Sequence, residues 1–380
     1  MLIARRTDDS HLTDWYYGID RALLFCVLGL ILVGMIAAIS TGSAMTMRKG
    51  WHWYHFFVSM LPFYVVGLAT MFVVSLLNKR NVMLLTWVNV AVCMVLLFVT
   101  LVHPVTVNGS SRWVGLGGIN IMPSDVLKPG FIMVTAWFIS KMKEKFGNNI
   151  FTRDAWQISV FSWWTYIAVF GFIALVLFKQ PDIGTLLLYG AVTGGMLFVA
   201  GLPLKICGIL GAVVVCGFVG AFFLKHHVHE RVLDFFKPLD PNSQVGYSIN
   251  SIRQGGLFGM GDEAFAAEKL PMAESDFVYA ALVEDFGAIL ACIMLCVMLY
   301  MINRLIRDAR GARDPFVFYA TSGAALLFAF QISINLATTL NLMPPTGITL
   351  PFISFGGSSF LSFCLLFGML FAIIREDKWK

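Results

Sequence analysis

The stretch that decides the fold is "FVYAALVEDFGAILACIMLCVMLYM", which runs from Phe277 to Met301. It is long enough to cross a membrane, because a helix needs about 20 apolar residues to span the hydrocarbon core. Around it, 58% of the 380 residues are hydrophobic and only 13% are charged. A water-soluble chain of this size cannot bury so much apolar surface. The sequence therefore predicts an integral membrane protein.

Runs of similar length recur along the whole chain. They lie near 22–40, 55–77, 82–102, 126–141, 157–178, 183–202, 204–225, 277–301, 316–338 and 357–374. They lack the strict alternation of a membrane β-barrel strand. The first run has no small-residue cleavage site, so we expect it to stay as a helix. The prediction is an all-α, polytopic membrane protein of about ten transmembrane helices, forming a single domain over residues 1–380.

Positive charge sets the expected orientation. With the N-terminus inside, most of the 27 Lys and Arg fall on the inner side, as cytoplasmic loops prefer. An even number of spans then places both termini in the cytoplasm and three long segments outside, at 103–125, 226–276 and 339–356. The net charge of +5 restates this asymmetry and gives no reason to expect nucleic acid. All seven cysteines lie in apolar runs, so neither a disulfide framework nor a cysteine metal site is expected.

The outer segment "NGSSRWVGLGGINIMPSDVLKPGF" (108–131) contains a candidate anion site. Ser124 is expected to cap a helix, which places Lys128 near the first turn, where the helix dipole is already positive. A bound anion would offset that penalty, so Arg112 and Lys128 are candidates to hold a phosphate or diphosphate. In the structural alternative, Lys128 extends to the lipid headgroups and Arg112 pairs with Asp125.

A second outer helix start is "FKQPDIGTLLL" (178–188). Pro181 suits the first helical position, and Asp182 suits the positive end of the dipole. Capping is the simpler interpretation of this pattern. In the other interpretation, Gln180 and Asp182 face a polar cavity.

The segment 226–276 is too long for a simple turn, and long loops are commonly functional or disordered. It contains the amphipathic piece "HHVHERVLDFF" (226–236), whose Arg231 is a candidate to bind substrate. It also contains "RQGGLFGMG" (253–261), a weak match to a phosphate-binding loop. Because no strand precedes it and no Lys-Ser/Thr pair follows, a turn-rich loop is the expectation.

The segment "NLMPPTGITLPFISFGGSS" (341–359) is rich in proline and glycine and separates two apolar runs. Irregular backbone at membrane depth must be buried in protein or line a wet cavity. Ser354 and Ser358 are therefore candidates to bind a polar headgroup. A plain re-entrant turn is the alternative.

Carboxylates mark the start of the deciding stretch. Asp276 stands where the loop meets the apolar run, and Glu284 and Asp285 lie about two turns further in. Asp276 is either a helix cap or a base that accepts a proton from a hydroxyl nucleophile at the membrane surface. Glu284 is expected to face the interior and pair with a buried donor, in a structural or coupling role that Asp125 would share.

Together these stretches resemble the SEDS family of membrane proteins over nearly the whole chain. The motifs "GSSRW", "QPDIGT", "GGLFGMG", "KLPMAESDFVYAALVEDFG" and "PPTGITLPFISFGGSS" occur in family order. "PPTGITLPFIS" resembles the cell-division branch more than the elongation branch. The departures are "SFGG" for "SYGG", "AESDF" for "PHTDF", and Asp125 where Glu is more usual. By the matching motif, Asp276 is the essential outer-loop Asp of the family.

The resemblance implies a peptidoglycan glycosyltransferase that polymerises lipid II at the outer face of the bacterial cytoplasmic membrane during septal wall synthesis. Asp276 would be the general base, and Arg112 and Lys128 would stabilise charge on the diphosphate leaving group. The further substrate-binding candidates are Gln180, Asp182, Arg231, Ser354 and Ser358. The implied partners are lipid II, a class B penicillin-binding protein acting as the septal transpeptidase, and other division proteins. A divalent cation (Mg or Mn) stays open, because no ligand set is evident.

Two rival functions are a lipid II flippase and a non-catalytic scaffold that activates the penicillin-binding protein. A flippase would need polar groups through the whole depth of the bilayer. The acidic residues mostly cluster at the outer face, with Glu284 and Asp285 as the exceptions. That distribution favours chemistry at the membrane surface. The polar residues that converge there also weigh against a pure scaffold.

Overall fold

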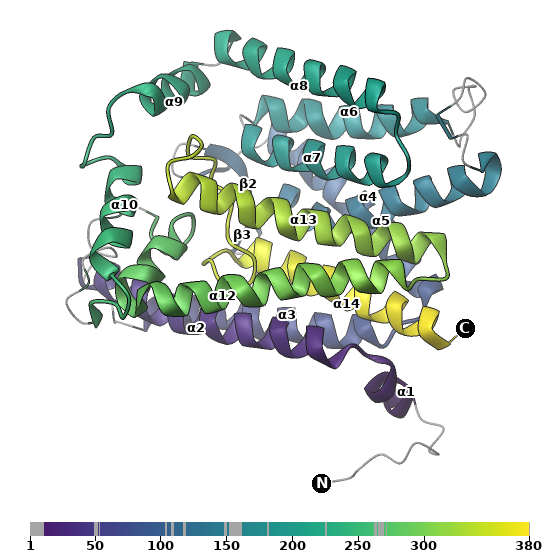
Figure 1. Cartoon of the computed structure of the whole chain (residues 1–380), viewed down its shortest axis with the longest axis horizontal. Helices are drawn as coiled ribbons and strands as arrows, with labels where there is room; N and C mark the ends of the chain where they lie inside the picture. Colours follow the sequence, from purple (N-terminus) through teal and green to yellow (C-terminus); the bar gives the residue numbers. More distant parts are fainter. Residues whose placement is uncertain are drawn as a thin grey trace.

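The fold is a bundle of helices with a small sheet at one end (Figure 1). This computed structural model describes residues 11–48, 52, 54–102, 105–107, 110–116, 119–147, 150–151, 162–180, 182–224, 226–261, 264, 270 and 272–379. The helices are α1 (His11–Gly18), α2 (Arg21–Arg48), α3 (His55–Ser75), α4 (Lys79–Val102), α5 (Pro123–Phe146), α6 (Trp163–Lys179), α7 (Ile183–Val199), α8 (Leu204–Leu224), α9 (His226–Phe236), α10 (Gln244–Gly255), α12 (Val278–Arg310), α13 (Pro315–Thr339) and α14 (Gly357–Trp379). The strands are β1 (Val105–Val107), β2 (Ser110–Leu116) and β3 (Ile119–Ile121).

Each predicted apolar run corresponds to one helix, α2 to α8 and α12 to α14, so the all-α membrane fold is confirmed. Within the described ranges, six helices are long and apolar enough to cross a membrane: α2, α3, α4, α12, α13 and α14. The apolar helices α6 and α7 are shorter. The exact number of spans therefore stays a prediction. On the outer faces of α2, α3 and α4, exposed apolar side chains such as Phe25, Val65 and Leu84 suit contact with lipid.

The centre of the bundle is α14, which packs along α3 and α5. Its Phe363 and Phe367 are buried beside Phe328 of α13. Phe352, from the segment that precedes α14, joins this cluster, with its ring centroid 5.3 Å from that of Phe367. Close-packed aromatic side chains of this kind hold their backbone firmly. The irregular segment before α14 is thus anchored to the core of the molecule.

The helix α12 is broken at Gly287, where φ is +86° and ψ is 167°. A break leaves backbone groups on both sides without helical partners. The "RQGGLFGMG" segment supplies them, because Ala288 N donates to Gly256 O (2.9 Å) and Met260 N donates to Glu284 O (2.7 Å). The segment contains the end of α10 followed by a turn, as expected, and it completes the hydrogen bonding of a broken membrane-length helix.

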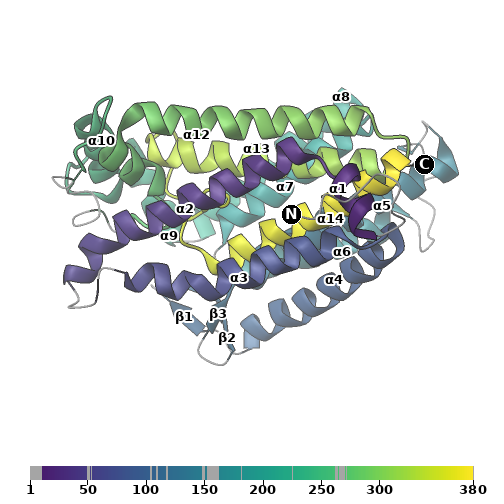
Figure 2. The same cartoon turned by 90° about the horizontal axis from the view of Figure 1, so that it is seen from below.

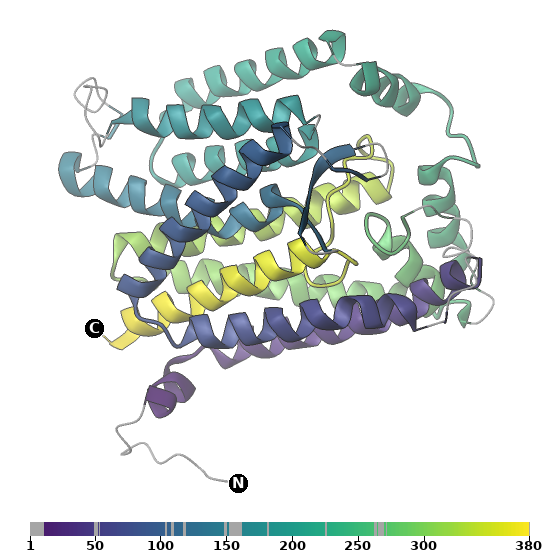
Figure 3. The same ribbon diagram turned by 180° about the vertical axis from the view of Figure 1, so that it is seen from behind.

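The irregular segments gather at one end of the bundle, which we call the loop end (Figure 3). It holds the sheet β1–β2–β3, the helices α9 and α10, and the segment 341–356 (Figure 1). At the opposite end, α1 packs against α14, so the first and last described helices meet there (Figure 2). The sheet is antiparallel throughout and was not predicted. It matters here because β2 carries Arg112.

Candidate functional site

Three predicted site residues come together around the loop end of the bundle. The Arg112 Nη1 atom lies 3.2 Å from Asp182 Oδ1. A Cβ atom placed on Gly347 would lie 3.7 Å from Asp276 Oδ2 and 3.8 Å from Arg112 Nη1. Asp276, which is predicted to be catalytic, and Arg112, which is predicted to bind phosphate, therefore both lie close to Gly347. These neighbouring residues come from distant parts of the sequence. Arg112 belongs to β2, Asp182 precedes α7, Asp276 precedes α12, and Gly347 lies in the segment before α14.

Asp276 is held in a tight turn and is half-buried. Its backbone N donates to Met272 O at 3.1 Å, and Met272 has a φ of +61°. The N-cap of α12 is Phe277, so Asp276 lies just before the cap. Asp276 is thus next to the N-terminus of α12 without being its N-cap residue. The Asp276 carboxylate instead faces the neighbourhood of Gly347.

The turn that carries Asp276 is fastened to the segment 341–356. Phe355 N donates to Glu274 O at 2.7 Å. The Ser354 hydroxyl donates to Ser275 O at 2.5 Å. Two successive backbone carbonyls before Asp276 are thus fixed from the same neighbouring segment, which limits how far the carboxylate can move.

The two serines predicted to bind substrate have structural partners. Besides its bond to Ser275 O, the Ser354 hydroxyl accepts from Leu350 N at 2.7 Å. The Ser358 hydroxyl accepts from Met122 N at 2.9 Å, at the start of α5. Both serines are buried. These bonds give both hydroxyls a role in shaping the site, and their binding of substrate stays a prediction.

Arg112 pairs with Asp182 in the structure, where the structural alternative expected Asp125. Asp182 is only 1% exposed and caps α7, accepting from Thr185 N at 3.3 Å. Capping is thus confirmed, but α7 begins at Ile183 and not at Pro181, which lies outside the described residues. Burial raises the pKa of the Asp182 carboxyl, and the Arg112 guanidinium acts in the opposite direction. The Asp182 carboxylate thus caps α7 and also neutralises the charge of Arg112.

Lys128 points into the protein. Its side chain is 3% exposed, and its Nζ atom lies 2.6 Å from Asp125 Oδ1. The expectation that Lys128 reaches the lipid headgroups is therefore wrong. Asp125 lies in the first turn of α5, where a negative charge is favourable. It offsets the penalty of a lysine near a helix N-terminus, which had suggested a bound anion.

The start of α5 also differs from the prediction. Its N-cap is Met122, and Pro123 occupies the first helical position. Ser124 is therefore inside the helix and is not the cap. Proline suits that position because it lacks an N–H and its φ is already helical.

The remaining candidates lie in different surroundings. Gln180 is buried, and its amide donates to the Thr100 hydroxyl of α4. Glu284 is 0% exposed and faces the interior, as predicted. Its neighbour Asp285 accepts a hydrogen bond from the Ser40 hydroxyl of α2. Arg231 is on α9, at the periphery of the bundle (Figure 1), and its side chain lies outside the described part of the chain.

Two buried amides of α13, Gln331 and Asn335, were missed by the sequence interpretation. They are four residues apart and so share one face of the helix. Hydropathy predicts only an apolar span over 316–338. Polar side chains at this spacing inside a membrane-length run were the signal that could have identified them.

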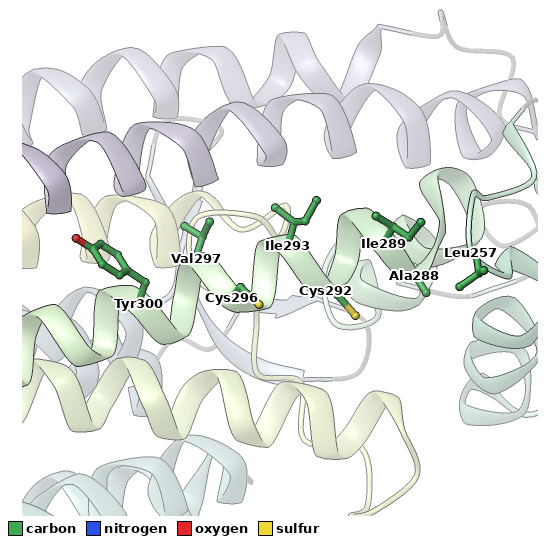
Figure 4. A pocket seen from close by; sticks show the side chains of 8 residues that line it. All are labelled: Leu257, Ala288, Ile289, Cys292, Ile293, Cys296, Val297 and Tyr300. Carbon is green, nitrogen blue, oxygen red and sulfur yellow. The ribbon is translucent and has the colours of Figure 1, made fainter.

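Other features of the described residues do not compete for this chemistry. Among them, no three His, Cys, Asp or Glu side chains come together as metal ligands would. An apolar groove of about 550 Å³ runs along the second half of α12 (Figure 4). It is lined by Leu257, Ala288, Ile289, Cys292, Ile293, Cys296, Val297 and Tyr300. No carboxylate and no cation is among the residues that line this groove.

The arrangement at Gly347 can support a group transfer. A half-buried carboxylate can accept a proton, and a guanidinium nearby can stabilise developing negative charge. The buried partners of Arg112 and Lys128 hold both cations at the loop end without mobile surface side chains. A substrate that brings a hydroxyl and a diphosphate would suit this pair of groups.

Comparisons with known proteins give consistent relatives along the whole chain. A model of the FtsW, RodA and SpoVE proteins, described as "Cell cycle protein", matches residues 21–379. The chain is 30% identical over 378 residues to "Probable peptidoglycan glycosyltransferase FtsW" of Caulobacter vibrioides, covering 98% of this chain and 93% of the relative. It is 29% identical over 381 residues to "Stage V sporulation protein E" of Bacillus subtilis, covering 95% and 98%.

Solved structures share the fold. One, described as "Structural coordination of polymerization and crosslinking by a peptidoglycan synthase complex", has a TM-score of 0.74 at 23% identity, over 95% of this chain and 99% of that chain. Another is the rod shape determining protein RodA of Thermus thermophilus, with a TM-score of 0.66 at 20% identity, over 94% and 97%. At such identities the likeness concerns the arrangement of the helices.

Proposed function

The chain belongs to the FtsW/RodA/SpoVE family of cell cycle proteins, and from this we propose that it is a peptidoglycan glycosyltransferase that polymerises lipid II into glycan strands. The relatives named as such glycosyltransferases support the reaction class. The observation that carries the proposal is that Asp276 and Arg112 both lie close to Gly347, where an added Cβ would be 3.7 Å from Asp276 Oδ2 and 3.8 Å from Arg112 Nη1. A base and a cation at one point are what this reaction needs.

In the proposed reaction, the 4-hydroxyl of an acceptor sugar attacks the anomeric carbon of the donor. The new bond joins the acceptor oxygen to that carbon, and the bond from the carbon to the diphosphate breaks. Asp276 takes the hydroxyl proton as general base. The electron pair leaves with the lipid diphosphate, whose negative charge Arg112 stabilises. Lys128 adds positive charge at the loop end, and its direct contact with the diphosphate is part of this proposal.

The chain is a multi-pass membrane protein, and we propose that the loop end faces the outside of the bacterial cytoplasmic membrane. The described parts of the three segments expected outside lie at that end, and α1 meets α14 at the other. Both termini would then be cytoplasmic. The segment 226–276 would be a large outer loop of a single membrane domain, and the cell-division relatives favour a place at the septum.

We propose a class B penicillin-binding protein as partner. The similar structure of a peptidoglycan synthase complex is described as coordinating polymerization and crosslinking. Crosslinking is the reaction of a transpeptidase, which this chain would need from another protein.

The function is tested by supplying labelled lipid II to the purified chain in detergent, with and without its penicillin-binding partner. Labelled glycan strands that lysozyme degrades are the expected product. Proteoliposomes with lipid II in the inner leaflet provide the second measurement. Movement of lipid II to the outer leaflet without strands would contradict the proposal and favour a flippase. An intact complex that gives neither result would favour the scaffold.

A further inference from the structure

Gln331 and Asn335 are two buried amide side chains of α13. They lie one turn apart on the same face, and both are fully or almost fully buried, at 0% and 1% exposed. A buried carboxamide is costly unless its donors and acceptor are used. Gln331 uses both its amide nitrogen and its oxygen, and Asn335 uses its amide nitrogen twice, while Asn335 Oδ1 has no hydrogen-bond partner among the described residues.

Asn335 joins the turn of Asp276 to the segment 341–356. Its Nδ2 atom donates to Asp276 O at 2.9 Å and to Ile348 O at 2.7 Å. Both hydrogens of one amide group are thereby used. Ile348 follows Gly347, which lies close to both Asp276 and Arg112. The bond to Asp276 acts on the backbone of the residue that carries the carboxylate.

Gln331 makes the corresponding link for Lys128. Its Oε1 atom accepts from Lys128 Nζ at 3.0 Å. Its Nε2 atom donates to Thr349 O at 3.0 Å. The two amides therefore bind consecutive carbonyl groups, at Ile348 and Thr349. In addition, Asn335 binds the backbone of Asp276, and Gln331 binds the side chain of Lys128.

We propose that Gln331 and Asn335 are a pair of positioning residues, which set Asp276 and Lys128 in place relative to the backbone at Gly347. This inference rests on the proposed function. An amide suits both positions, because residue 335 supplies two donors and residue 331 supplies a donor and an acceptor. A displacement of about 1 Å at a reacting group can cost about 100-fold in rate.

The first test replaces each amide with an apolar side chain of similar size. Asn335→Leu is expected to lower kcat for strand formation by about 100-fold, with the KM for lipid II changed less than about twofold, because the base is misplaced while the binding groups remain. Gln331→Met is expected to lower kcat/KM by about tenfold, through Lys128. Thr321→Val is the matched control, since Thr321 is buried on the same helix and its hydroxyl has no partner among the described residues.

A second pair of variants separates positioning from simple damage. Gln331→Glu keeps an oxygen that accepts from Lys128 and is expected to recover part of the activity that Gln331→Met loses. Asn335→Ser keeps one donor, is expected to fall between wild type and Asn335→Leu, and replaces Asn335→Leu if that variant does not fold. Rates are expressed per folded protein, measured by size-exclusion chromatography and thermal unfolding in detergent.

The outcomes are distinct. A wild-type chain without polymerase activity overturns the proposed function. An active wild type with Asn335→Leu at wild-type kcat overturns the inference alone. A KM that rises as much as kcat falls in Asn335→Leu, with no recovery in Asn335→Ser or Gln331→Glu, also overturns it, because that pattern indicates general disruption.

Discussion

Single residues of the site are held in charge pairs that water barely reaches. Arg112 pairs with Asp182 and Lys128 pairs with Asp125. Removing one partner of a buried pair leaves a charge without compensation, which costs about 3–5 kcal/mol in soluble proteins. The same arrangement keeps both cations ready at the loop end. With the proposed function, a change in either pair would affect both stability and activity.

Asp182→Ala is expected to lower the thermal stability of the chain in detergent and to reduce polymerisation. The variant removes the partner of Arg112 and also the cap of α7, and loss of a cap alone costs about 0.5–2 kcal/mol. Asp234→Ala is the control, because Asp234 pairs with Lys237 on an exposed surface, where such pairs contribute about 0–1 kcal/mol. Equal melting temperatures for the two variants would contradict the assigned role of Asp182.

Gly347→Ala tests the space beside the Asp276 carboxylate and the Arg112 guanidinium. Gly347 has a φ of +75°, so any side chain strains the backbone, by about 1–2 kcal/mol. The added Cβ would also stand beside Asp276 and Arg112. A fall of about tenfold in kcat/KM for lipid II is expected.

Gly201→Ala provides the matched control for this substitution. Gly201 has a φ of +95°, and nothing lies within 4 Å of its added Cβ. Both variants therefore carry the backbone strain, and only one changes the site. If they reduce polymerisation equally, the space at Gly347 has no special role.

Among the elements, the irregular ones shape the site. The segment 341–356 provides the carbonyl groups and the glycine around which the charged residues lie. The "RQGGLFGMG" segment completes the hydrogen bonds of α12 at its break. The first is tied to the core by Phe352, and the second fits closely against α12.

Gly287→Ala, at the single glycine of α12, is expected to damage the fold severely. Its Cβ would lie 2.2 Å from Leu257 O, a contact that the backbone must move to relieve. We expect loss of folded protein or a large fall in the melting temperature. Gly190→Ala in α7 is the control, because its Cβ meets nothing within 4 Å and alanine favours a helix by about 1 kcal/mol. A stable, active Gly287→Ala variant would mean that the break is not required.

Hydropathy predicted the helices well, because a segment that crosses lipid must be apolar and must satisfy its own backbone hydrogen bonds. The runs that correspond to α2, α3 and α4 show this. Hydropathy did not predict the break in α12, because the sequence is apolar on both sides of Gly287. The sheet was missed because β1 and β3 have three residues each and depend on pairing with β2. Sequence motifs identified Asp276 and Arg112, but the partners Asp182 and Asn335 depend on contacts between distant segments.

Across the whole molecule, the two ends differ in kind. The loop end holds the site, and the opposite end is tied by ion pairs between helices, such as Arg304 of α12 with Asp20 at 2.5 Å and Lys79 of α4 with Asp314. The Asp377 carboxylate of α14 accepts hydrogen bonds from Arg313 N and Asp314 N. The end with the proposed site thus stands opposite an end where ion pairs and hydrogen bonds hold the helices together.

The proposed orientation predicts different accessibility at the two ends. Single cysteines are introduced as Asp240→Cys, at the loop end, and Arg310→Cys, at the end of α12. In intact spheroplasts, a membrane-impermeant maleimide should label Asp240→Cys at once and Arg310→Cys only after permeabilisation. The parent chain is the control for its native cysteines. The reverse order of labelling would contradict an outward-facing site.

In the proposed function, the Asp276 carboxylate acts as the base in glycan polymerisation at the loop end. The most direct test compares strand formation from labelled lipid II by the wild-type chain, Asp276→Asn and the control Asp240→Asn, each purified with the penicillin-binding partner. Asparagine keeps the shape of the side chain and cannot accept the proton in the same way. We predict strands from the wild type and from Asp240→Asn, and none from an intact Asp276→Asn complex. Strands from Asp276→Asn at the wild-type rate would contradict the account.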